Sequence, residues 1–198
     1  SYRSLRALIS KYNSINEDEV IVTNGADEAL DVISKVFIDS RSDVIISSPT
    51  YSLFRIVSQI MNGNLISVPR LNDFNDDIMG LVKASKNPNL VFLNSPNNPT
   101  GNLVIENCVK TLLEETNSFI FIDEAYFEFS GHSFKDLAIK EPRLIIVRTL
   151  SKAFSLAGAR VGYIIANKST IGLLNKVRFP NSLNMLSIAL AEIALNDI

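Results

Sequence analysis

The chain has 198 residues, 46% of them hydrophobic, and its 19 basic and 21 acidic side chains leave a formal net charge of −2. This balance argues against nucleic acid or an anionic membrane as a main partner, and no apolar run reaches transmembrane length or resembles a signal peptide. The single cysteine, Cys108, excludes an internal disulfide and favours a cytoplasmic location.

Hydrophobic periodicity predicts strands that alternate with helices along the chain. The expected strands cover residues 20–23, 43–47, 64–68, 89–94, 119–123, 143–148 and 160–166. The expected helices cover residues 2–12, 26–38, 52–61, 76–86, 105–116, 168–178 and 183–196. This alternation predicts an α/β fold, a three-layer α/β/α sandwich with a mainly parallel seven-stranded sheet, in one domain. Such open sheets bind ligands at the carboxyl ends of their strands.

The segment after the first expected strand has the features of an anion site. Gly25 permits a tight turn, and helical spacing begins at Ala26. Because the free N–H groups and the dipole of a helix N-terminus favour negative charge, this turn can bind a phosphate. Asp27 and Glu28 are equally the first-turn acids that a helix dipole favours, and the two interpretations are compatible.

Polar residues also follow the fourth and fifth expected strands. Pro99 favours an extended or turn conformation at Asn98, whose amide can then meet a ligand oxygen, although an ordinary loop has the same composition. Asp123 stands where an apolar run ends, and a buried carboxylate needs a partner, such as a protonated pyridine nitrogen. Tyr126 can reach the phenolic oxygen of the same ring. Asp123 as the cap of the next helix is an equally good explanation.

Lys152 follows the sixth expected strand and is the most informative residue of the chain. A lysine at the end of a buried strand can have a partly desolvated amine, which is a nucleophile toward an aldehyde. Thr149, Ser151 and Arg160 lie close in sequence and offer donors for a phosphate. An amine for an aldehyde beside donors for a phosphate is the combination that pyridoxal phosphate requires. The alternative is a surface lysine in a polar turn, and the upstream segments count against it.

Five motifs, in order, resemble those of the fold-type I pyridoxal-phosphate enzymes. They are Gly-Ala-Asp-Glu-Ala at 25–29, Pro-Thr-Tyr at 49–51, Ser-Pro-Asn-Asn-Pro-Thr-Gly at 95–101, Asp-Glu-Ala-Tyr at 123–126 and Thr-Leu-Ser-Lys-Ala-Phe at 149–154, with Arg160 beyond. Within that group they look like class II aminotransferases of the histidinol-phosphate aminotransferase type. The order and spacing agree over nearly all 198 residues.

The resemblance implies a role for each matched residue. Lys152 would bond the cofactor aldehyde and later act as the base that moves a proton. Asp123 would pair with the pyridine nitrogen, and Tyr126 would bond the phenolic oxygen together with Asn98. Tyr51 would stack on the ring. The implied phosphate contacts are the backbone N–H groups of Ala26 and Asp27 and the side chains of Thr149, Ser151 and Arg160.

The resemblance also implies a homodimer that acts on a small-molecule substrate. The implied reaction of histidine biosynthesis converts histidinol phosphate and 2-oxoglutarate to imidazole acetol phosphate and glutamate. We expect residues 1–198 to be the cofactor-binding large domain, with the family's N-terminal arm and C-terminal small domain outside this sequence. An apolar stripe of Leu5, Leu8 and Ile9 either meets the partner subunit or packs on its own subunit.

Several alternatives stay open at the level of sequence. Another aminotransferase or a threonine-phosphate decarboxylase can use the same cofactor residues, and a non-catalytic α/β domain can retain the motifs. A nucleotide-binding Rossmann domain is disfavoured, because Gly-x-Gly-x-x-Gly is absent after the first strand. No metal site is expected from a single histidine, His132, and one distant cysteine.

Overall fold

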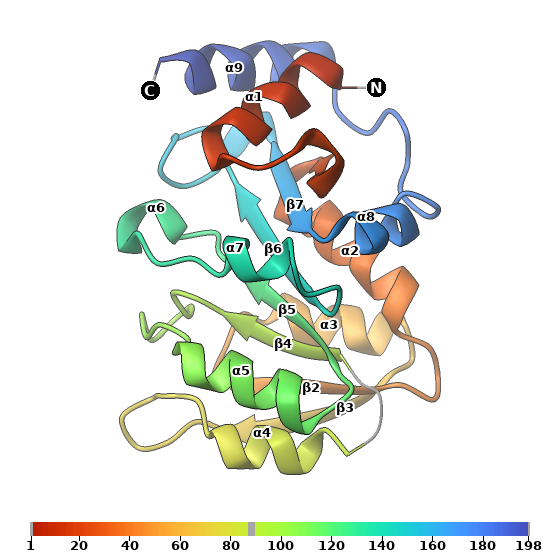
Figure 1. Cartoon of the computed structure of the whole chain (residues 1–198), viewed down its shortest axis with the longest axis vertical. Coiled ribbons are helices and arrows are strands. Elements are labelled where there is room, and N and C mark those ends of the chain that lie inside the picture. Colours follow the sequence, from red (N-terminus) through yellow and green to blue (C-terminus); the bar gives the residue numbers. More distant parts are fainter. Residues whose placement is uncertain (1, 87–89, 198) are drawn as a thin grey trace. The chain divides into compact units, whose positions relative to one another are not determined.

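The computed structural model describes residues 2–86 and 90–197. Its strands are β1 (Val20–Thr23), β2 (Asp43–Ser48), β3 (Asn64–Pro69), β4 (Leu90–Asn94), β5 (Phe119–Asp123), β6 (Leu144–Thr149) and β7 (Gly162–Ala166). Its helices are α1 (Arg3–Asn13), α2 (Gly25–Phe37), α3 (Leu53–Ile60), α4 (Ile78–Ala84), α5 (Glu106–Glu115), α6 (Phe127–Ser130), α7 (Lys135–Ala138), α8 (Lys168–Leu174) and α9 (Met185–Asn196), with 3₁₀ turns η1 (Glu17–Glu19) and η2 (Ala157–Ala159). The strands form one sheet in the order β1-β7-β6-β5-β4-β2-β3, which confirms the predicted fold class (Figure 1).

The expected strands and long helices are present, and the differences lie at their ends and in four short helical turns. Position 89, the expected first residue of β4, lies outside the described residues. β7 begins at Gly162 instead of 160, because Arg160 adopts a left-handed backbone conformation with a φ of 52°. α4 begins two residues late, because Asp77 caps it by accepting a hydrogen bond from the N–H of Gly80. α8 ends four residues early, and α6, α7, η1 and η2 are too short to produce a helical period.

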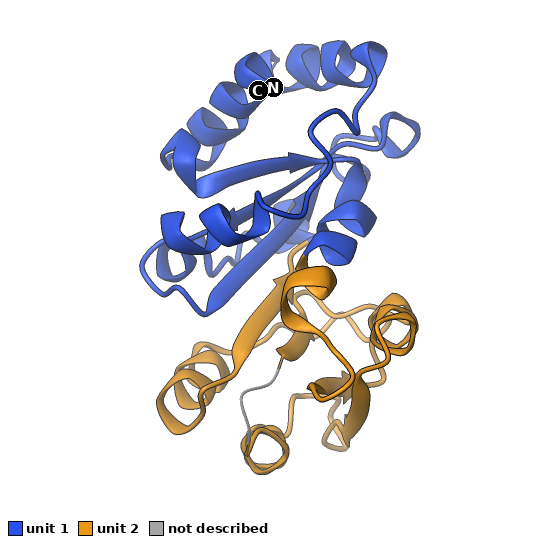
Figure 2. Cartoon of the chain, turned by 90° about the vertical axis from the view of Figure 1, so that its right-hand side faces the viewer, with its two compact units in different colours: residues 1–32, 125–198 blue, residues 33–124 orange. Residues whose placement is uncertain are grey.

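The chain divides into two compact units, which Figure 2 shows in different colours. Unit 1 comprises residues 1–32 and 125–198, and unit 2 comprises residues 33–124. β1, β6 and β7 belong to unit 1, and β2 to β5 belong to unit 2. The residues expected to bind a ligand are distributed over both units.

In unit 1, β7 pairs antiparallel with both β1 and β6. β1 and β6 therefore run in the same direction, and their carboxyl ends lie at the same edge of the sheet. α1 packs on β1 and α9, and its residues Leu5 and Ile9 are fully buried. The apolar stripe of α1 therefore faces the core of its own unit, which is the second of the two interpretations given for it.

Unit 2 contains four parallel strands in the order β5-β4-β2-β3. Figure 1 shows α5 in front of these strands and α3 behind them, and Figure 2 agrees. Under α3, the Phe54 ring stacks on Phe92 with centroids 4.9 Å apart and meets Phe121 edge-on at 5.7 Å. On α5, burial raises the pKa of the Cys108 thiol to about 12. The lone cysteine is therefore a core residue with very little thiolate at neutral pH.

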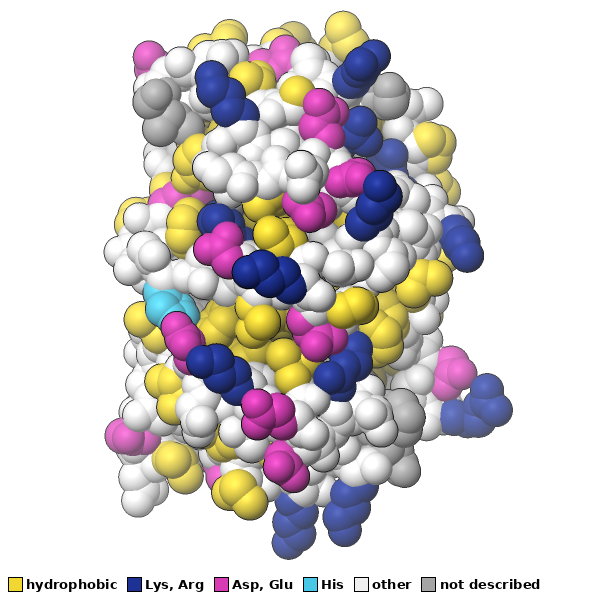
Figure 3. Space-filling view, in the orientation of Figure 1, with side chains coloured by type: hydrophobic (Ala, Val, Ile, Leu, Met, Phe, Trp, Pro, Cys, Tyr) yellow, Lys and Arg dark blue, Asp and Glu magenta, His cyan; other side chains and the backbone are white. Residues whose placement is uncertain are grey.

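None of the helices in residues 2–86 and 90–197 combines the length and the apolar character that a membrane span requires. The same residues include no group of three or more His, Cys, Asp or Glu side chains that could hold a metal ion. His132 instead packs edge-on against Phe134, with ring centroids 4.9 Å apart. On the face shown in Figure 3, basic and acidic side chains are interspersed and do not gather into a patch of one sign.

Candidate active site

The sheet of unit 1 aligns residues from three strands in one row. The register pairs Thr149 of β6 with Gly162 of β7, and Gly162 with Thr23 of β1. Thr149 and Thr23 are the last residues of their strands. The segments that follow them therefore leave the same edge of the sheet, with β7 between them. The candidate ligand-binding residues on these two segments are Ala26, Asp27, Ser151 and Lys152.

Gly162 allows the N-terminus of α2 to approach the sheet closely. A Cβ atom at this position would lie 2.5 Å from the carbonyl carbon of Gly25 and 2.7 Å from the backbone nitrogen of Ala26. Both distances are well below a normal carbon contact. The first turn of α2, whose N–H groups have no partner within the helix, therefore begins directly beside β7. A helix N-terminus in this position favours an anion.

We expect Gly162→Ala to lower the free energy of unfolding by about 1–3 kcal/mol, because the added methyl group meets backbone atoms of α2. Urea unfolding measures this loss. Gly172→Ala in α8 is the matched control, because a Cβ atom there has no neighbour within 4 Å. Equal unfolding free energies for the two variants would contradict the close packing of α2 on β7.

Arg160 provides the cation of this region. Its Nη2 atom lies 2.8 Å from Oδ2 of Asp27, and the two side chains are 45% and 54% exposed. The guanidinium also lies against Gly25, where a Cβ atom would come within 2.8 Å of Nη2. The left-handed backbone of Arg160 costs about 1–3 kcal/mol, and such strain at a residue with a side chain is typical of functional sites.

Thr149 and Ser151 add a pair of hydroxyl groups at the end of β6. The Thr149 hydroxyl donates to the Ser151 hydroxyl at 2.9 Å or to the Val161 carbonyl at 3.1 Å, and it accepts a bond from the Ser151 N–H at 3.2 Å. Unit 1 thus combines two hydroxyls, a guanidinium and the N–H groups of a helix N-terminus. This set of donors fits a phosphate group.

Lys152 and Tyr126 lie together in unit 1, with the Lys152 Nζ atom 5.2 Å from the centroid of the Tyr126 ring. The Lys152 side chain is exposed, so the partial desolvation expected of its amine is not found. The reason is that Lys152 stands in the turn beyond the end of β6 and not at the end of the buried strand itself. The amine is accessible to a ligand in this position.

In unit 2, β4 and β5 bring the expected acid and amide to one edge of the sheet. Asp123 ends β5, is 6% exposed and is in register with Asn94, the last residue of β4. The N–H of Ser95 donates to the Asp123 carbonyl at 2.9 Å. Asn98 follows in the same turn and is half-buried. The segment after β4 is therefore hydrogen-bonded to the strand that carries the acid.

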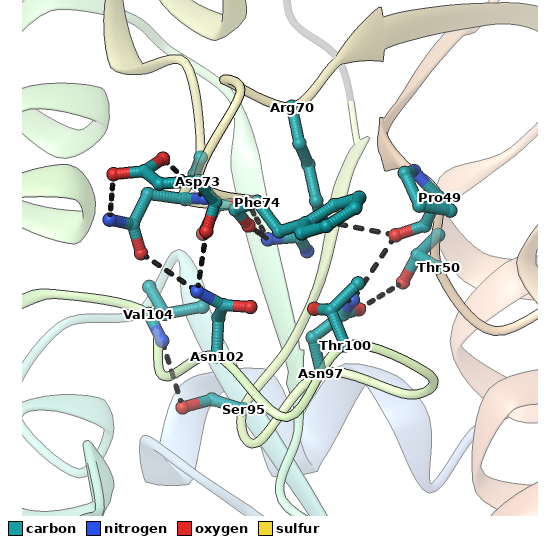
Figure 4. Close-up of polar contacts among 12 residues, drawn as sticks. Pro49, Thr50, Arg70, Asp73, Phe74, Ser95, Asn97, Thr100, Asn102 and Val104 are labelled. Atoms are coloured by element: carbon teal, nitrogen blue, oxygen red, sulfur yellow. Dashed lines mark hydrogen bonds and ion pairs between the residues drawn. The ribbon is translucent and has the colours of Figure 1, made fainter.

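A polar network joins the loops that follow β2 and β4 (Figure 4). Asn97 is 3% exposed and donates through Nδ2 to the Pro49 carbonyl at 3.1 Å and to the Thr100 hydroxyl at 2.8 Å. Its Oδ1 accepts a bond from the Thr50 hydroxyl at 2.9 Å. Tyr51 comes directly after the first of these loop segments, and Asn98 lies within the second. The network therefore ties the two expected ring contacts of unit 2 to one framework.

Arg70 anchors the loop between β3 and α4 to the same framework (Figure 4). It donates from Nε to the Pro49 carbonyl at 3.0 Å and from Nη1 to the Phe74 carbonyl at 3.1 Å. Nη1 also lies 3.0 Å from Oδ1 of Asp76, and both side chains are buried. Burial raises the pKa of the Asp76 carboxyl and lowers the pKa of Arg70, while the opposite charge of each partner counteracts the shift.

Asp76→Asn is expected to lower the free energy of unfolding by about 3–5 kcal/mol, because it leaves the buried Arg70 guanidinium without its counter-ion. Asp39→Asn is the control, since the Asp39–Arg41 pair is 58% and 89% exposed and its loss should have little effect. Both values come from urea denaturation. If the two variants lose the same stability, the Arg70–Asp76 pair is not an anchor.

Sequence reasoning missed the residues that support the expected contacts. Asn97 lies inside the 95–101 motif, and its place beside Asn98 was the available signal. Gly162 directly follows an apolar residue at the start of a strand, where a glycine can mark close backbone approach. Arg70 and Asp76 flank a polar loop with no distinguishing pattern, so only the structure pairs them.

The fold and these residues define a class of protein: an α/β protein that presents a lysine amine, an acid and phosphate donors at the carboxyl ends of its strands. Residues 2–197 match the family described as aminotransferase class I and II. The chain therefore belongs to the class I and II aminotransferase family.

The relatives within this family include histidinol-phosphate aminotransferases. Those of Thermoanaerobacter pseudethanolicus and Sulfurisphaera tokodaii are 35% and 39% identical over 189 and 187 residues. The alignments cover 94% and 91% of this chain but 54% and 52% of the relatives. The crystal structure of histidinol-phosphate aminotransferase from Sinorhizobium meliloti in complex with pyridoxal-5'-phosphate matches 99% of this chain and 55% of its own, with a TM-score of 0.90 at 27% identity. The chain thus spans about half the length of the relatives it matches.

Proposed function

We propose that residues 1–198 form the cofactor-binding large domain of a pyridoxal-phosphate-dependent aminotransferase, of the histidinol-phosphate aminotransferase type. The observation that carries the proposal is the contact of Lys152 with Tyr126 in a unit that also holds a set of phosphate donors. Family membership supports the reaction type. The matching crystal structure with bound pyridoxal-5'-phosphate supports the cofactor.

Unit 1 supplies the contacts to the cofactor phosphate in this proposal. The N-terminus of α2 contributes its N–H groups, because Gly162 lets that helix begin directly beside β7. Arg160 contributes a cation that is held in place by Asp27. The complete set of proposed phosphate contacts is the backbone of Ala26 and Asp27 and the side chains of Thr149, Ser151 and Arg160.

The proposed contacts to the cofactor ring rest on the matched motifs. Asp123 pairs with the ring nitrogen, as the match of the motif at 123–126 implies, and its small exposure would keep water away from this pair. Asn98 and Tyr126 donate hydrogen bonds to the phenolic oxygen, and Tyr51 stacks on the ring. The Asn97 network supports the roles of Asn98 and Tyr51, because it holds both loops by side-chain bonds.

Lys152 provides the amine and the base. When bound, pyridoxal phosphate supplies an aldehyde that condenses with amines and a ring that withdraws electrons from the adjoining carbon. The exposed Lys152 amine would hold the cofactor through its aldehyde carbon, and the free amine would be the base that carries a proton from the substrate carbon. Tyr126 limits the positions open to the amine, since its ring lies 5.2 Å from Nζ.

We propose histidinol phosphate and 2-oxoglutarate as the substrates, in histidine biosynthesis. The support is the name shared by the two relatives, which are 35% and 39% identical to this chain. The test is to add histidinol phosphate to the cofactor-loaded protein and to measure imidazole acetol phosphate by mass spectrometry. O-phosphothreonine is the comparison substrate. Release of carbon dioxide from it, without any product from histidinol phosphate, would assign the chain to a decarboxylase.

We further propose that the protein is a cytoplasmic homodimer that associates through α9. The helix exposes four large apolar side chains that share one face, Met185, Leu186, Leu190 and Ile193, at 82%, 78%, 48% and 68% exposure. An exposed apolar face of this kind is typical of an association surface. The location is supported by the single cysteine.

Light scattering should give the mass of a dimer, and the double variant Leu186→Glu with Ile193→Glu should give the mass of a monomer. The reason is that burying two unpaired carboxylates in an apolar interface is costly. The control is Lys168→Glu at the start of α8, where Lys168 forms an exposed ion pair with Asp18. This variant changes the charge of the surface without altering α9, and it should remain a dimer. A wild-type protein that stays monomeric over a wide concentration range would contradict the proposal.

A further inference from the structure

Arg148 is a charged side chain enclosed within unit 1. It lies in β6, four residues before Lys152, and is 1% exposed. The strand residues before it, 144–147, are all apolar. A buried guanidinium is costly unless neighbouring groups satisfy its donors and its charge. The partners that satisfy Arg148 therefore show which segments it holds together.

These partners come from three other segments of unit 1. Nη1 donates to Oδ1 of Asn13, at the end of α1, at 2.7 Å. Nη2 donates to the Ser133 hydroxyl at 2.5 Å. The guanidinium carbon lies 3.4 Å from the centroid of the Phe127 ring, the first residue of α6. Arginine suits this position because its planar group can contact a ring face while its edges donate hydrogen bonds.

Two cation–ring contacts connect the same two segments of the chain. Arg148 contacts Phe127, and Lys152 contacts Tyr126 with its Nζ atom 5.2 Å from the ring centroid. The two cations belong to β6 and the turn after it, and the two rings are neighbours in sequence. The buried Arg148 guanidinium lies 3.4 Å from its ring centroid, whereas the exposed Lys152 amine lies 5.2 Å from its own, so the first contact is the tighter one.

α1 adds a second connection between these segments. The Tyr12 ring meets the Phe154 ring edge-on, with centroids 5.8 Å apart. Burial, and then the charge of Glu128, raise the pKa of the Tyr12 phenol. Phe154 lies two residues after Lys152, and Glu128 lies two residues after Tyr126. The end of α1 therefore contacts both segments.

We propose that Arg148 is a positioning residue which, through Phe127, fixes the Tyr126 ring beside the Lys152 amine. The inference rests on the proposed function, which gives Tyr126 and Lys152 their roles at the cofactor. Arg148 is buried and acts only through the segments that it holds. When it is altered, the cofactor contacts that depend on Tyr126 should change, and those of the phosphate donors should not.

The test is a double-mutant cycle between Phe127→Leu and Tyr126→Leu. Phe127→Leu keeps an apolar side chain but removes the ring that Arg148 contacts, so it avoids the unfolding that a direct loss of the buried charge risks. Phe74→Leu is the matched control, because it makes the same change at a ring that is 49% exposed and lies between β3 and α4 in unit 2. Arg148→Lys is a further variant, since lysine keeps the charge and lacks the planar group.

The first measurement uses protein without cofactor, so that it does not depend on the proposed function. Trace acetylation of Lys152, quantified by peptide mass spectrometry relative to Lys168, reports how the ring shields the amine. We expect Phe127→Leu to raise the rate about two- to fivefold, the factor that corresponds to losing an exposed cation–ring contact. Tyr126→Leu should give the same rise, and the double variant should give no more than either single change.

The second measurement uses protein with pyridoxal phosphate. The pH midpoint of its visible absorption band should shift in Phe127→Leu and Arg148→Lys in the same direction as in Tyr126→Leu, and should stay at the wild-type value in Phe74→Leu. Additive effects in the double variant, or a wild-type acetylation rate in Phe127→Leu, would overturn the proposal. If wild-type protein fails to bind the cofactor while the acetylation cycle behaves as expected, the proposed function fails and the positioning of Tyr126 by Arg148 stands.

Discussion

Lys152→Ala should abolish the visible absorption band that wild-type protein gives with pyridoxal phosphate. The band requires a bond between a protein amine and the cofactor aldehyde, and an alanine has no amine. The Lys152 amine is exposed, lies 5.2 Å from the Tyr126 ring and follows the hydroxyl pair of Thr149 and Ser151. Absorbance titration of the purified proteins with the cofactor measures the effect.

Lys168→Ala is the control for this prediction. The Lys168 side chain is 77% exposed and pairs with Asp18 at 2.7 Å at the start of α8, away from the segments after β1 and β6. It should retain the full visible band. A band of wild-type intensity in Lys152→Ala would show that another amine binds the cofactor, and the proposed role of Lys152 would be wrong.

Asp123→Asn should weaken cofactor binding by about two to four orders of magnitude. This factor corresponds to the roughly 3–5 kcal/mol that is typical when one partner of a buried charge pair is removed. Asparagine keeps the size of the side chain, so the change isolates the charge that would pair with the ring nitrogen. Equilibrium dialysis with pyridoxal phosphate gives the dissociation constants.

The control for Asp123 is Asp43→Asn, at the amino end of β2, where the Asp43 carboxylate accepts a bond from Asn64. It should bind the cofactor like the wild type. Near wild-type affinity in a folded Asp123→Asn protein would mean that Asp123 is a structural acid at the end of β5. The helix-capping role that the sequence also allowed does not apply, because the N-cap residue of α6 is Tyr126.

Most of the fold could be predicted from the sequence because buried strands and amphipathic helices have distinct periods. The apolar runs at 90–93 and 119–122 became β4 and β5 with ends within a residue of those expected. The start of β7 could not be predicted, because the left-handed conformation of Arg160 depends on contacts with Asp27 and Gly25 that are distant in sequence.

The candidate site shows the same division between local and long-range information. The motifs identified residues at the ends of strands, and the structure brings Thr149, Ala26 and Arg160 into one region of unit 1. The supporting residues were not predictable, because their partners are far apart in sequence. Arg148 shows this most clearly, since its hydrogen bond to Asn13 spans 135 positions.

The most direct test of the central claim is to locate the cofactor on the protein. Wild-type protein is mixed with pyridoxal phosphate, reduced with borohydride, digested and analysed by peptide mass spectrometry. We predict a single adduct on Lys152, because its amine stands beside Tyr126 in the unit that holds the phosphate donors. An adduct on Lys11 or Lys168, or an even distribution over exposed lysines, would contradict the account.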